Sequence, residues 1–119
     1  MTRWTAPLLW MLLIFVVSGQ STLPHADEAI VDVLLKKTAH FSEYFILCLL
    51  WVRALLITSN SRRKQVLIAC LISGVYAITD EVHQAFVPGR HPSIMDVFID
   101  WVGIMVAAVA AIRLSKKLT

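Results

Sequence analysis

The sequence predicts an all-α fold, an integral membrane bundle of four transmembrane helices. Of its 119 residues, 58% are hydrophobic and only 16% are charged, which is more apolar than an ordinary water-soluble domain. The apolar residues gather in long runs, and about 20 such residues are what a helix needs to cross the hydrocarbon core of a bilayer. The polar connectors between the runs are too short to divide the chain, so we expect a single domain over residues 1–119.

Four apolar runs follow one another along the chain. We expect helices over residues 4–19, 30–57, 66–86 and 94–114. The first run follows a short basic start and ends in small residues, a pattern that also describes a signal peptide. We expect this helix to be retained, because the other three spans alone would put the chain ends on opposite sides of the membrane and break the charge pattern described below.

Turn and cap signals bound the last two runs. The uncharged run VLIACLISGVYAI leads directly into TDEVHQ, so a span of about 20 residues from Val66 puts Asp80 in the last membrane turns of the third helix. Two prolines and a glycine in VPGRHPS predict a turn. Ser93 and Asp96 then fit the S-x-x-D pattern of a capping box that starts the fourth helix, and a site role for Asp96 is an equal alternative.

Lysine and arginine are unevenly distributed between the connectors. If successive helices alternate in direction, eight of the 11 basic residues fall on one side. These are Arg3, Arg53, Arg62, Arg63, Lys64, Arg113, Lys116 and Lys117. Because basic loops stay in the cytoplasm, we predict a multi-pass protein of the cytoplasmic membrane with both termini cytoplasmic. We attribute the net charge of +3 to this asymmetry and to contact of the basic residues with anionic membrane lipids. The sequence has no basic stripe with interleaved aromatic residues, which argues against nucleic acid as a partner.

The acidic residues lie on the other side of the predicted membrane. All eight fall in outer loops or in the outer halves of helices, so we expect function to face outward. On the third helix Asp80, His83 and Gln84 stand at i, i+3 and i+4 and share a face. Similar spacings on the neighbouring helices are Lys37, His40, Glu43 and Tyr44 on the second and Asp96, Asp100 and Gly103 on the fourth.

Ionisable side chains inside a membrane usually turn toward the bundle interior or a water-filled cavity, because contact with lipid is costly. We therefore expect an outward-facing polar pocket between the second, third and fourth helices, with Arg90 covering it and pairing with a carboxylate of Asp80, Glu81 or Asp96. The alternative is that these groups only pair with one another and hold the helices together. The expected pocket residues are Lys37, His40, Glu43, Tyr44, Asp80, Glu81, His83, Gln84, Arg90, Ser93 and Asp96.

The pocket residues leave the type of chemistry open. His40 with Glu43 and Asp80 with His83 are histidine and carboxylate pairs at i, i+3, the spacing found in metal sites of helix bundles. Nearby basic side chains would offset the carboxylates equally well, so we expect no metal and no cofactor. A general acid and base drawn from these four residues is chemically possible, and the sequence does not decide whether the chain is an enzyme. The two cysteines lie within helices, away from basic clusters, and are expected to be buried free thiols.

The order KKTAHFSEYFIL followed by YAITDEVHQAFVPGRHPSIMDVFIDWVG resembles the VanZ-like family of small bacterial membrane proteins. The similarity runs from the first helix to the last. Its D-E-x-H-Q-x-F-x-P-G-R segment followed by S-x-x-D-x-x-x-D/N-x-x-G is long and unusual. One position departs from the family, which commonly has D-K before the first histidine where this chain has Lys36 and Lys37. The resemblance adds Pro88, Gly89 and Gly103 to the pocket residues as motif positions.

The resemblance implies a multi-helical protein of the bacterial inner membrane that serves the cell envelope. The family takes its name from a factor for resistance to teicoplanin, a glycopeptide antibiotic. The resemblance does not supply an agreed reaction. We expect the pocket to bind or modify an anionic envelope molecule, such as a lipid-linked precursor or a phospholipid head group, with Arg90 and Lys37 contacting phosphate and His83 supplying polarity or proton transfer. The alternative is a structural or partner-binding membrane module whose polar cluster staples the helices.

Overall fold

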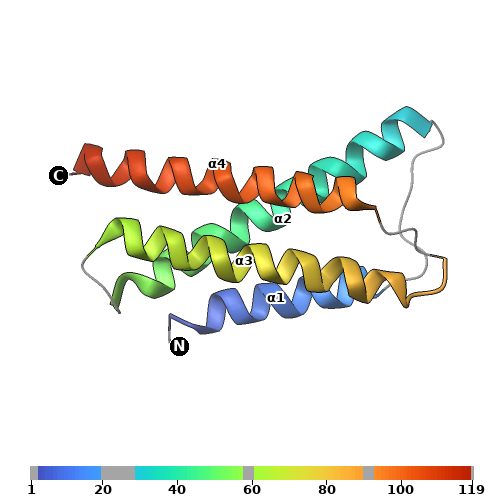
Figure 1. Ribbon diagram of the computed structural model, residues 1–119, viewed down its shortest axis with the longest axis horizontal. Helices are drawn as coiled ribbons and strands as arrows, with labels where there is room; N and C mark the ends of the chain where they lie inside the picture. The colour runs from blue at the N-terminus through green and yellow to red at the C-terminus, as the bar shows by residue number, and fades with distance from the viewer. Residues whose placement is uncertain (1–2, 20–28, 58–60, 90–92, 119) are drawn as a thin grey trace.

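The computed structural model describes residues 3–19, 29–57, 61–89 and 93–118, which form four α-helices and no strand. The helices are α1 (Thr5–Ser18), α2 (Ala29–Ala54), α3 (Arg62–Ala85) and α4 (Ile94–Leu118), and a 3-10 turn, η1 (Leu55–Ile57), extends α2. They lie lengthwise in one bundle whose longest dimension is 48 Å (Figure 1). The predicted all-α bundle is therefore confirmed.

The first helix is short, in agreement with the predicted range of residues 4–19. Pro7 lies in its first turn, where a missing N–H costs nothing because helix N-termini leave these groups unpaired. The helix ends at Gly19, whose N–H reaches the carbonyl oxygen of Phe15 at 3.0 Å. Its 14 residues rise only ~21 Å, less than the ~30 Å hydrocarbon core of a bilayer.

Serine residues cap the two long apolar helices. The Ser61 hydroxyl accepts a hydrogen bond from the N–H of Lys64 at 3.4 Å, and this cap starts α3 four residues earlier than the predicted Val66. The Ser93 hydroxyl accepts from the N–H of Met95 at 3.2 Å at the start of α4, as the predicted capping serine should. Gly89, in the turn that follows α3, has a φ of 82°, a left-handed conformation that explains a glycine there.

Two helices of the described chain are long and apolar enough to cross a membrane, namely Arg62–Ala85 and Ile94–Leu114. The prediction of four spans is therefore not confirmed: α3 and α4 meet the requirement of length and composition, and α1 and α2 do not. α1 is too short, and the N-terminal half of α2 is interrupted by charge, including an Asp32–Lys36 ion pair at 3.0 Å. The family resemblance and these two helices point to a membrane protein.

Apolar residues, several of them small, fill the core where the helices meet. Leu47, Cys48, Ala69, Ala77 and Ala107 are fully buried. Many large apolar side chains instead face outward along the whole bundle, a surface suited to lipid and unusual for a water-soluble monomer. Both cysteines are free thiols, as predicted, although the one on α3 is only half-buried.

The chain direction brings the polar segments to one end of the bundle. In Figure 1 the start of α1 and the end of α4 lie at one end, whereas the end of α3 and the start of α4 lie at the other. The motif residues near the end of α3 and the start of α4 therefore occupy the same end of the bundle.

Candidate functional site

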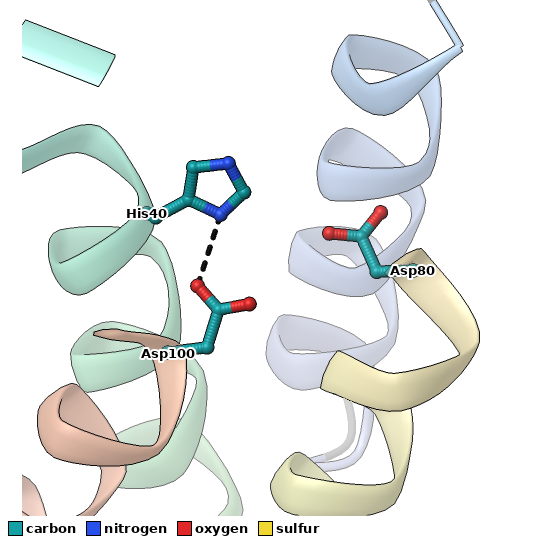
Figure 2. Close-up of side chains that lie close together, drawn as sticks. All are labelled: His40, Asp80 and Asp100. Atoms are coloured by element: carbon teal, nitrogen blue, oxygen red, sulfur yellow. Dashed lines mark hydrogen bonds and ion pairs between the residues drawn. The ribbon is translucent and has the colours of Figure 1, made fainter. Parts of the chain in front are cut away.

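Three helices converge on a cluster of ionisable side chains, defined by His40 on α2, Asp80 on α3 and Asp100 on α4 (Figure 2). His40 Nδ1 lies 2.9 Å from Asp100 Oδ1, a hydrogen bond in which the ring N–H donates to the carboxylate. One ligand atom from each of the three residues lies within 4.8 Å of the others. Both carboxylates are buried, and the imidazole is only slightly exposed. We refer to these residues as the His-Asp-Asp cluster.

The close approach of α2 and α4 explains how His40 reaches Asp100. Gly103 lies one turn after Asp100, and a Cβ atom added there would lie 2.5 Å from the carbonyl oxygen of Phe41 and 3.3 Å from the N atom of Phe45. Only glycine permits this backbone contact without a shift. The glycine of the motif therefore determines the spacing of the two helices beside the cluster.

A tyrosine fixes the second carboxylate. Tyr44 lies one turn after His40 on α2 and is completely buried. Its hydroxyl donates a hydrogen bond to Asp80 Oδ2 at 3.2 Å, so it ties α2 to α3. Because each buried carboxylate receives a hydrogen bond from α2, this helix organises both of them.

A more exposed ion pair lies toward the start of α4. Lys37 Nζ lies 3.8 Å from Asp96 Oδ1, and both side chains keep contact with solvent. Asp96 thus pairs with α2, so the acidic half of the predicted capping box has a different role. Glu81 receives a hydrogen bond from the Ser93 backbone and contributes to the connection between α3 and α4.

The other polar residues of α3 face α1. Gln84 is buried and donates to the hydroxyl of Ser18 at 3.4 Å. The His83 ring stacks on Phe15 with its centroid 4.3 Å away and the rings 9° from parallel. Glu43 contributes to the same interface through its carbonyl oxygen, which accepts from the Trp10 indole at 2.8 Å.

The structure therefore divides the predicted pocket into three parts. Among the eleven predicted residues, His40, Tyr44 and Asp80 belong to the cluster or its hydrogen bonds. Lys37, Asp96, Glu81 and Ser93 surround the start of α4, and His83, Gln84 and the backbone carbonyl of Glu43 contact α1. Arg90, including its predicted pairing with a carboxylate, lies outside the described residues.

Two members of the site were missing from the predicted pocket list. Asp100 stands on the same helical face as Asp96 and interrupts an apolar helix. This pattern was sufficient to place Asp100 among the predicted pocket residues. The sequence did not indicate a site role for Ser18, because a serine after an apolar run usually marks only the end of a helix. Its contact with Gln84 depends on how α1 packs.

The geometry permits two kinds of chemistry. An imidazole held by a carboxylate has one ring nitrogen committed to that hydrogen bond, which fixes its tautomer and orientation. Such an imidazole can exchange a proton with a bound molecule or contribute to cation binding. Among the residues that the structure describes, His40 forms its side-chain hydrogen bond with Asp100 and none with a serine or cysteine, so nucleophilic catalysis gains no support there.

A family model described as VanZ/LLP1 matches residues 4–115. The matched range includes α1 to α3, α4 as far as residue 115, and all the residues of the cluster. No curated protein and no solved structure matches the chain. The long motif, the bundle and this match lead to one conclusion: the chain belongs to the VanZ/LLP1 family.

Proposed function

We propose that this VanZ-family protein is a multi-pass protein of the bacterial cytoplasmic membrane whose polar end faces outward and binds or modifies an anionic cell-envelope molecule. The observation that carries the proposal is the meeting of three ionisable side chains from three helices in an otherwise apolar bundle. Buried charges are costly in a membrane environment and frequently mark functional sites. An aliphatic core would hold three helices together at lower cost.

The expected contact with an anion is Lys37. Its side chain is 40% exposed, and its partner Asp96 is 3.8 Å away, so the ion pair is loose enough to exchange partners. A phosphate near Lys37 would lie at the solvent-facing margin of the cluster. Arg90, which follows the turn at Gly89 in the sequence, would supply a second and bidentate donor.

The structural alternative also has a specific observation in its favour. The His40–Asp100 and Tyr44–Asp80 hydrogen bonds each join two helices and need no ligand. In this account the cluster staples the bundle, and the chain acts through a partner protein. A His40→Gln variant discriminates between the two. The staple predicts loss of folded protein from the membrane, whereas a binding site predicts normal abundance with loss of the ligand effect described next.

The binding proposal is tested by thermal unfolding of the detergent-purified protein. We expect phosphatidylglycerol or an isoprenoid phosphate to raise the midpoint in a saturable way, and phosphatidylcholine to have little effect. A Lys37→Gln variant should lose most of the rise. A Lys36→Gln variant is the matched control, because Lys36 pairs with Asp32 on the same helix and should keep it. Equal responses to anionic and zwitterionic lipids would remove the basis of the proposal.

The proposed topology is tested separately. Cysteines introduced at Ser61 and His91, with Cys48 and Cys70 replaced by alanine, can be labelled in intact cells by an impermeant thiol reagent. Labelling at position 91 alone is expected. Labelling at position 61 alone would show the opposite orientation and contradict the proposed topology. If the chain shares the role of the family's namesake, its expression should also raise the teicoplanin concentration needed to stop growth.

A further inference from the structure

The His-Asp-Asp cluster carries more buried negative charge than its neighbours balance. Asp80 is 5% exposed and Asp100 is 1% exposed, so both carboxylates are almost fully removed from water. Two carboxylates this close and this buried repel each other unless a proton or a cation lies with them. This imbalance is a property of the packed helices and does not depend on the proposed envelope ligand.

The described residues do not supply enough compensation. His40, when protonated, balances one carboxylate through its bond to Asp100. Lys37 pairs loosely with a third carboxylate, that of Asp96. Among residues 3–19, 29–57, 61–89 and 93–118, only the uncharged hydroxyl of Tyr44 donates a hydrogen bond to the Asp80 side chain, and it reaches one of the two oxygens.

The Asp80 carboxylate faces the other two residues of the cluster. In Figure 2 its carboxylate points from α3 toward the His40–Asp100 pair. Asp80 is thus a carboxylate more than nine-tenths buried that lacks a charged partner in the described structure and is directed at an imidazole and a second carboxylate. This arrangement suits a cation bound between the three residues.

We infer that His40, Asp80 and Asp100 bind a divalent first-row transition-metal ion, with Zn²⁺ or Mn²⁺ as the best matches. One imidazole nitrogen with two carboxylates suits these ions, whereas Mg²⁺ and Ca²⁺ prefer oxygen ligands alone. The three ligand atoms lie within 4.8 Å of one another. Donors that share an ion at ~2.1 Å are at most about 4.2 Å apart, so a small side-chain rotation closes the site.

Three protein ligands leave at least one coordination position open. A water molecule or an oxygen atom of an anion would fill it, and the ion would neutralise the two carboxylates that would otherwise repel an anionic ligand. The metal site does not depend on the proposed envelope ligand, since the ion balances Asp80 and Asp100 whether or not an envelope molecule binds.

The first experiment measures metal binding with the ion as the only probe. The detergent-purified full chain is treated with a chelator, dialysed and titrated with Zn²⁺ or Mn²⁺ while bound metal is measured by mass spectrometry. We expect saturation near one equivalent and a rise of several degrees in the unfolding midpoint. Asp80→Asn and His40→Gln should each lower affinity at least tenfold, with unchanged circular dichroism as the check on folding.

Two matched variants serve as controls. Asp96→Asn removes an acid near the same end, and His83→Gln removes the histidine stacked on Phe15, so both should bind metal as the wild type does. Loss of binding in the controls to the same extent as in the cluster variants would overturn the site. Absence of saturable binding to the wild type would overturn it as well.

A wild-type measurement keeps the inference testable if the cluster variants fail to fold. Electron spin-echo spectroscopy of the Mn²⁺-loaded protein should reveal coupling to a directly coordinated ¹⁴N nucleus, which in this cluster is an imidazole nitrogen of His40. Bound Mn²⁺ without nitrogen coupling would contradict the ligand set. Because no lipid is added in these experiments, their failure leaves the proposed envelope ligand untouched, and failure of lipid binding leaves the metal site untouched.

Discussion

The contact between Gly103 and α2 gives a prediction whose size follows from the structure. In a Gly103→Ala variant the new methyl group would start 2.5 Å from the Phe41 carbonyl oxygen, whereas ordinary contact begins near 3.4 Å. The helices must therefore separate by roughly 0.9 Å, because the obstructing atom belongs to the backbone. Overpacking of this kind costs about 1–3 kcal/mol, partly offset by ~0.5–1 kcal/mol from the better helix propensity of alanine.

The net loss is expected to be about 1–2 kcal/mol, equivalent to a fall of roughly 3–8 °C in the unfolding midpoint. Tryptophan fluorescence during heating in detergent measures it. Gly74→Ala is the control, since its methyl group would meet only the Trp101 indole nitrogen at 3.7 Å, and this variant should be as stable as the wild type or slightly more. Equal midpoints for the two variants would refute the close approach of α2 and α4.

Three further substitutions test single contacts by the same assay. Tyr44→Phe removes the donor to buried Asp80 and should cost about 1–3 kcal/mol; an unchanged midpoint would mean that this bond is absent. Lys37→Met breaks only a loose, partly exposed ion pair with Asp96 and should cost no more than about 1 kcal/mol, so a large loss of stability would assign Lys37 a structural role. Ser61→Ala removes the cap of α3 and should cost about 0.5–2 kcal/mol, and fraying confined to residues 62–65 in hydrogen exchange is the expected signature. A uniform change in exchange along α3 would contradict that assignment.

The sequence predicted the helices well because hydrophobic runs and caps are local signals. The predicted first helix, residues 4–19, agrees with Thr5–Ser18, and the fourth begins at Ile94 as expected from the cap. The start of α3 was predicted late, since the basic residues after Ser61 are not apolar, although they extend the helix. The polar half of α2 likewise departs from a simple membrane span, because its charged residues pair along and between helices.

The candidate site was predicted less completely, because helical spacing identifies a face and leaves the facing partner open. His83 and Gln84 share a face with Asp80 as predicted, yet the packing of α1 draws them toward Phe15 and Ser18. The importance of Asp100 depends on its bond to His40, sixty positions away in the chain. Such a long-range pair has no signature in the local pattern of one sequence.

The central claim is that the polar end of the bundle holds an envelope molecule. The most direct test is native mass spectrometry of the protein taken from its own membranes with minimal detergent, compared with the His40→Gln variant purified in the same way. The account predicts a phosphate-bearing envelope lipid on the wild type and its loss from a variant that remains folded. Wild-type protein without a retained anionic lipid, or the same lipid at the same occupancy on both proteins, would contradict the claim.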